Sequence, residues 1–91
     1  MNDPFVIEQT QRWAKRILEI PNLTEVQRVE VMYQEAFARK PTEAERAAAL
    51  EFLDQQGAEY RLPADQARRD ARVWGDLGHV LVNVKEFIYL N

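Results

Sequence analysis

The four prolines divide this chain into helical segments. Proline fixes its own backbone angle and lacks an N–H donor, so it stands at helix starts or just past helix ends. The prolines occupy positions 4, 21, 41 and 63 of 91 residues. Between them apolar residues recur at steps of three or four, which is the period of a helix. The sequence therefore predicts helices over about 4–20, 24–39 and 42–57, and through most of the chain after residue 63.

Capping residues stand beside three of the prolines. Asp3 precedes Pro4, where its carboxylate can accept from the free N–H groups of a first helical turn. Two further starts have the spacing of a capping box, in which Thr is followed three residues later by Gln or Glu. These starts are Thr24 with Gln27 and Thr42 with Glu45. The second and third helices are so closely joined that we expect them to form a hairpin.

Two signals in the second half predict interruptions. Gly57 follows an alanine-rich helix, and we expect it to end that helix and to open a loop that reaches residue 63. Further on, Asn83 interrupts an apolar run and has Glu86 three residues later, the spacing of a capping box variant. The last helix is therefore predicted to be long or broken once at Asn83, with a short helical turn after it.

Together these signals predict an all-α fold. We expect a compact bundle of four main helices with a short C-terminal helical turn, forming one domain over residues 1–91, because so short a chain buries too little surface for two cores. A composition of 46% hydrophobic and 30% charged residues is that of a globular domain. Trp13 and Trp74 are its largest apolar side chains, and we expect both in a core shared by the first and last helices.

The composition excludes several kinds of chemistry. The chain has no Cys and no Ser, which removes thiolate chemistry, Cys-type zinc sites and most acyl-transfer nucleophiles. Its three glycines are isolated, so no glycine-rich phosphate loop is present. A net charge of -3 disfavours nucleic acid, and no run approaches the roughly 18 apolar residues of a membrane span. We therefore predict no enzyme, no catalytic, cofactor-binding or metal-binding residue, no nucleic-acid partner and no membrane span.

Asp76, His79 and Asn83 form a constellation with helical spacing in the apolar C-terminal third. Positions three and four apart share one face of a helix, so the three side chains would lie within reach of one another. An imidazole beside a carboxylate can act as a base or a metal ligand. A metal needs three or four strong ligands, which this face offers only if Asp70 or Glu86 joins. We expect His79 at the edge of a helix interface with Asp76 as its partner, and keep the three as candidate interaction or site-lining residues.

A basic patch precedes and begins the last helix. Asp65 and Asp70 interrupt it, and no aromatic platform for nucleotide bases accompanies it. We expect these arginines to dock onto an acidic partner surface or to be solvated at the start of the helix. The patch consists of Arg61, Arg68, Arg69 and Arg72.

Three stretches resemble a known family in their order and spacing. They are NDPFVIEQ at 2–9, RVEVMYQEAFARKPTEAER at 28–46 and WGDLGHVLVNVKEFIYL at 74–90. The family is the planctomycete-type domain of unknown function found in large proteins that often also carry a planctomycete cytochrome c domain, and this chain resembles its C-terminal end. Lys40 and the pair Val84-Lys85 depart from the family pattern. The matching positions are Asn2, Pro4, Phe5, Arg28, Val29, Glu30, Tyr33, Arg39, Pro41, Thr42, Glu45, Asp76, Leu77, Leu81, Asn83, Glu86, Phe87 and Tyr89.

The resemblance implies that the chain is the C-terminal segment of a larger protein, to which Met1 was added as a start. It implies a periplasmic or extracellular parent whose haem, if any, sits in another domain; a cytoplasmic location is the alternative, since this chain carries no targeting signal. The family supplies no catalytic residue to transfer.

We therefore expect a non-catalytic helical packing or protein-interaction module. Its partner would be an upstream domain of the parent protein or another protein. The alternative is that the chain forms one wall of a substrate or carbohydrate site, completed by the upstream domain and lined by Asp76, His79 and Asn83. Exposure separates these hypotheses: side chains facing solvent in a concave pocket favour the second, and packed, bonded side chains favour the first.

Overall fold

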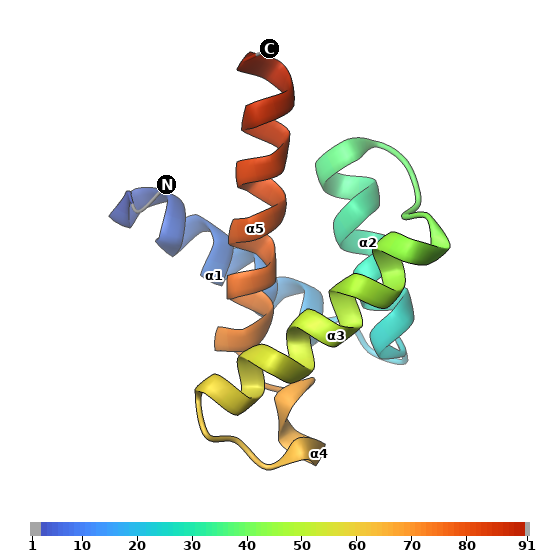
Figure 1. Ribbon diagram of the computed structural model, residues 1–91, viewed down its shortest axis with the longest axis vertical. Helices are drawn as coiled ribbons and strands as arrows, with labels where there is room; N and C mark the ends of the chain where they lie inside the picture. Colours follow the sequence, from blue (N-terminus) through green and yellow to red (C-terminus); the bar gives the residue numbers. More distant parts are fainter. Residues whose placement is uncertain (1–2, 91) are drawn as a thin grey trace.

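The computed structural model describes the backbone of residues 3–90 and the side chains of residues 3–84. The described chain is an all-α bundle, as predicted (Figure 1). Four long helices and one short helix follow each other without a strand among the described residues. Their bounds are α1 Pro4–Glu19, α2 Glu25–Phe37, α3 Glu43–Glu59, α4 Ala64–Ala67 and α5 Ala71–Leu90.

The predicted caps start the first three helices. Asp3, the residue before Pro4, accepts through Oδ1 from the backbone N–H of Phe5 at 2.8 Å. Both capping boxes are complete: in the second, Thr42 Oγ1 accepts from the Glu45 amide at 3.1 Å and Glu45 Oε1 accepts from the Thr42 amide at 2.8 Å. These local bonds fix where α1, α2 and α3 begin.

The core forms where α1 crosses α5, with α2 and α3 packed beside the pair (Figure 1). Trp74 is fully buried there, as predicted. Trp13 is only half-buried; its ring lies against Gly78, and its Nε1 donates to Glu35 Oε1 at 2.7 Å at the edge of the core. The fully buried or nearly buried core residues are Ala14, Ile17, Val29, Met32, Tyr33, Ala49, Leu53, Val73, Trp74, Leu77 and Leu81.

Gly57 does not end α3, so that prediction was wrong. The helix continues to Glu59, and Gly57 is buried against α4. A Cβ on Gly57 would lie 3.0 Å from the Ala67 Cα and would overlap the Ala67 Cβ. The glycine therefore provides close helix approach rather than a helix end. The connecting loop is correspondingly shorter, and Arg61 takes the left-handed backbone conformation in it, with φ 60°.

Of the two alternatives for the last helix, the long helix is confirmed and the break at Asn83 is wrong. Helix α5 runs without interruption from Ala71 to Leu90, so the short fifth helix, α4, precedes the last long helix instead of following it. An Asn inside a helix costs only about 0.7 kcal/mol or less relative to Ala, and neither Pro nor Gly follows it here to end the helix. The side chain of Glu86, which the predicted cap required, lies outside the described residues.

Candidate functional site

Asp76 joins α5 to the end of α3. Its Oδ2 accepts from the Tyr60 hydroxyl at 2.6 Å and from Gln56 Nε2 at 2.9 Å. The hydrogen bond to this carboxylate, with burial, raises the pKa of Tyr60 above its ordinary value. The Arg72 guanidinium lies 4.7 Å from the centroid of the Tyr60 ring. Asp76 therefore belongs to a polar contact between helices.

His79 and Asn83 lie one turn apart on α5, and both are half-buried. The predicted pairing of His79 with Asp76 is wrong: no hydrogen bond joins them in the part of the chain that the structure describes. Asp76 instead accepts, through Oδ2, from residues at the end of α3. The His79 Nε2 is buried without a hydrogen-bond partner among the described residues. Whether these three residues line a site stays a prediction.

The described residues form neither a cluster of metal ligands nor a membrane-spanning helix. No group of three His, Asp or Glu side chains among them is arranged to hold a metal ion. None of the helices they form is both long and apolar enough to cross a bilayer.

The basic patch is divided by ion pairs. Arg68 donates to both carboxylate oxygens of Asp54 on α3, at 2.9 and 2.8 Å. Arg72 donates to both oxygens of Asp70, each at 3.0 Å. These guanidinium groups lower the pKa of Asp54 and of Asp70. Arg61 and Arg69 are exposed, so the four side chains do not act as one surface.

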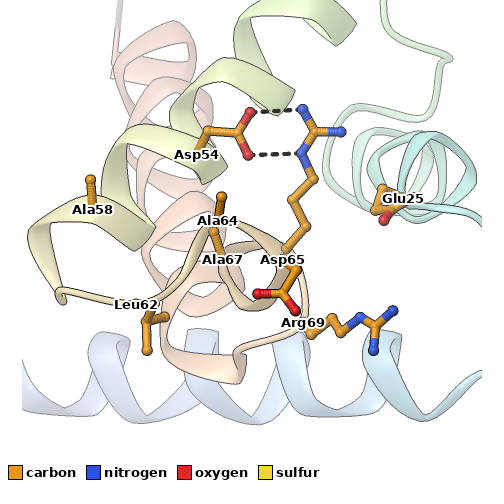
Figure 2. Close-up of a pocket in the computed structure, with 9 residues that line it drawn as sticks. Glu25, Asp54, Ala58, Leu62, Ala64, Asp65, Ala67 and Arg69 are labelled. Carbon is orange, nitrogen blue, oxygen red and sulfur yellow. Dashed lines mark hydrogen bonds and ion pairs between the residues drawn. The ribbon is translucent and has the colours of Figure 1, made fainter.

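A cavity lies between the end of α3, α4 and the start of α2 (Figure 2). Its volume is about 550 Å³. Asp54 stands at one edge of this cavity, and Arg69 stands at the opposite edge (Figure 2). The residues that line it are Glu25, Asp54, Ala58, Leu62, Ala64, Asp65, Ala67, Arg68 and Arg69.

A second cavity of about 340 Å³ adjoins the first, and we call it the arginine cavity. It is lined by Leu18, Leu23, Glu25, Arg28, Arg68 and Arg69. Sequence reasoning missed Arg28 as a site residue. The only local signal was its position three residues after Glu25, which places both side chains on one side of the first turn of α2.

An apolar stripe on α5 extends beyond the core. Leu77 and Leu81 are buried, whereas Val80 and Val84 on the same side of the helix are 42% and 45% exposed. Figure 1 shows the C-terminal part of α5 projecting past the other helices. We call Val80 and Val84 the exposed stripe.

Comparison with known proteins identifies the family. The family model PSD1, described as a protein of unknown function (DUF1553), matches residues 1–53. Searches of the curated proteins and of the solved structures found no match. The match covers more than half of the chain and confirms the resemblance to a domain of unknown function. The chain therefore belongs to the DUF1553 family of proteins of unknown function.

Proposed function

We propose that this domain is a non-catalytic helical packing and interaction module at the C-terminal end of a larger exported protein. The exposed stripe on α5 is the observation that carries the proposal. Val80 and Val84 continue the face that Leu77 and Leu81 bury in the core, but they have no covering helix among the described residues. Burying the rest of these side chains against a partner would be favourable by roughly 25 cal/mol per Å².

The partner proposed for this stripe is the part of the parent protein that precedes this domain. A preceding segment would enter at α1, whose first turn lies toward the same end of the long axis as the projecting part of α5 (Figure 1). Phe5 on that turn is 67% exposed, and Ile7 is 40% exposed. An upstream domain could therefore cover apolar residues of both helices at once.

The alternative function, one wall of a substrate site, depends on His79. In this alternative, Asp76, His79 and Asn83 form a site wall that faces a substrate or carbohydrate held by the upstream domain. The Nε2 of His79 has no hydrogen-bond partner among the described residues, which leaves it free to bond a ligand, but the atom is buried rather than turned toward solvent. Against this, the Asp76 carboxylate is already bonded to Tyr60 and Gln56. The packing module therefore has the stronger support.

Binding between the two parts of the parent protein tests the proposal. The upstream region, taken from the reading frame that continues through Asn2, is expressed separately and titrated with residues 1–91 by calorimetry. Val84→Asp should weaken the association by about tenfold or more, because a charge would be buried in the contact. His79→Ala should leave it within about twofold.

Ala47→Asp, at an exposed position on α3, is the matched control and should leave binding unchanged. Equal binding by the wild type and Val84→Asp would contradict the packing role, as would a reading frame that starts at Met1. Sedimentation of the isolated domain tests for one further outcome. If the wild type is a dimer and Val84→Asp is a monomer, a second copy of the domain covers the stripe.

A further inference from the structure

The arginine cavity concentrates positive charge in an acidic chain. The protein has 15 Asp and Glu residues against 12 Lys and Arg residues, yet three guanidinium groups and one carboxylate line this cavity. Arg28 comes from α2, whereas Arg68 and Arg69 come from the link between α4 and α5. Bringing these segments together costs repulsion between like charges, which an anion in the cavity would relieve.

The three arginines differ in how many of their guanidinium N–H donors are already used in hydrogen bonds to described residues. Arg28 uses Nη1 to donate to the backbone carbonyl of Ile17. Arg68 uses Nε and Nη2 for Asp54. Arg69 forms no ion pair with a described residue, and it lines both cavities. A guanidinium carries five N–H donors, so Arg69 and the remaining donors of Arg28 are available to a ligand.

The other lining residues restrict the ligand. Leu18 and Leu23 are half-buried apolar side chains at the same cavity, so a ligand that carries a small apolar group beside its charge can contact both kinds of lining residue. Glu25 contributes a negative charge to the lining, which repels a dianion more strongly than a monoanion. A carboxylate on a short aliphatic group meets both conditions better than a phosphate does.

We infer that the arginine cavity is a binding site for a carboxylate carried on an apolar group. Arg69 and Arg28 donate to the carboxylate, and Leu18 with Leu23 contact its apolar part. An acidic side chain or chain end of a polypeptide presents this chemistry, and so does a small aliphatic acid. The site is independent of the exposed stripe, because its lining comes from the end of α1, the α1–α2 turn, α2 and the link before α5, and includes neither Val80 nor Val84.

Titration of the ¹⁵N-labelled 91-residue protein with hexanoate tests the inference by NMR. Hexanoate should shift the side-chain Nε–Hε signals of Arg69 and Arg28. These shifts should reach a plateau at millimolar hexanoate concentrations. Hexanol, which has the same chain without the charge, should bind about tenfold more weakly, as should acetate and inorganic phosphate. Hexanol binding as tightly as hexanoate would overturn the site, since the arginines would then contribute nothing.

Variants identify the residues involved. Arg69→Gln should weaken hexanoate binding by about tenfold, because it removes an exposed cation without disturbing an ion pair. Arg61→Gln is the matched control, an exposed arginine that lines neither cavity, and it should bind like the wild type. Unchanged binding by Arg69→Gln, or an equal loss in Arg61→Gln, would place the anion elsewhere and refute the site.

The peptide N-acetyl-Leu-Leu-Glu amide distinguishes the two sources of the carboxylate. If it binds at least about tenfold more tightly than hexanoate, the natural ligand is a polypeptide, because peptide contacts add to the carboxylate. If hexanoate binds as tightly as the peptide, the ligand is a small aliphatic acid.

Discussion

At the scale of single residues, Glu45 connects the end of α2 with the start of α3. Its carboxylate accepts from the Thr42 amide at 2.8 Å and from both terminal nitrogens of Arg39, at 2.8 and 3.0 Å. The same guanidinium lies 5.8 Å from the centroid of Tyr33 and 5.6 Å from that of Phe37. The Arg39 hydrogen bonds, and then the Thr42 amide, lower the pKa of Glu45 to about 2. One carboxylate thus fixes the turn of the α2–α3 hairpin.

This pKa makes stability depend on pH in acid. The folded pKa lies below the unfolded value of 4.5, so the contribution of Glu45 is fully present above pH 4.5 and is lost as the pH falls toward 2. Solvent screens the exposed pair, so Glu45→Gln should lower the free energy of unfolding at pH 7 by about 1 kcal/mol. It should also reduce the loss of stability between about pH 5 and pH 2.

Urea unfolding of the wild type and Glu45→Gln at several pH values measures both effects. Glu51→Gln replaces an exposed acid farther along α3 and should follow the wild-type pH profile. If the free energy of unfolding falls equally with pH in the wild type and in Glu45→Gln, the pKa of Glu45 does not differ between the folded and unfolded states.

At the scale of elements, Gly57 sets the distance between α3 and α4. Alanine in place of a helical glycine ordinarily stabilises a helix by roughly 0.5–1 kcal/mol. Here the added Cβ would overlap Ala67, which is buried, so Gly57→Ala should instead destabilise the protein by about 1–3 kcal/mol. The double variant with Ala67→Gly should recover part of this loss, because it vacates the same space. Thermal and urea unfolding measure all three variants, and a more stable Gly57→Ala would disprove the tight contact.

Gly57 also marks the limit of what the sequence could predict. The starts at Asp3, Thr24 and Thr42 were predictable because each cap is formed within four residues. Gly57 was mistaken for a helix end because its partner, Ala67, belongs to another helix. The arginine cavity was missed for the same reason: Arg28 and Arg68 line it together although they are 40 positions apart in sequence, which no local pattern can indicate. Asp76 was assigned to His79 within one helix, whereas its partners lie on α3.

At the scale of the whole molecule, the two ends of the chain form one structural unit. Helix α1 packs more extensively against α5 than any other two helices pack against each other. Two glycines of α5 permit this approach, since Gln11 lies against Gly75 and Trp13 lies against Gly78. The apolar face of α1, with Ala14 and Ile17 fully buried, is therefore covered only when the last helix is in place.

This arrangement predicts that residues 1–53, the part matched by the family model, do not fold alone. The fragment lacks α5 and so loses Val73, Trp74, Leu77 and Leu81 from the core, leaving too small an apolar surface to offset the entropy of ordering three helices. Circular dichroism should show low helicity and no cooperative thermal transition for 1–53, in contrast to residues 1–91. Adding a peptide of residues 64–91 should restore a cooperative transition, because it supplies the missing partner of α1. A cooperative transition in the 1–53 fragment by itself would show that α1, α2 and α3 form a core of their own, with α5 an accessory to it.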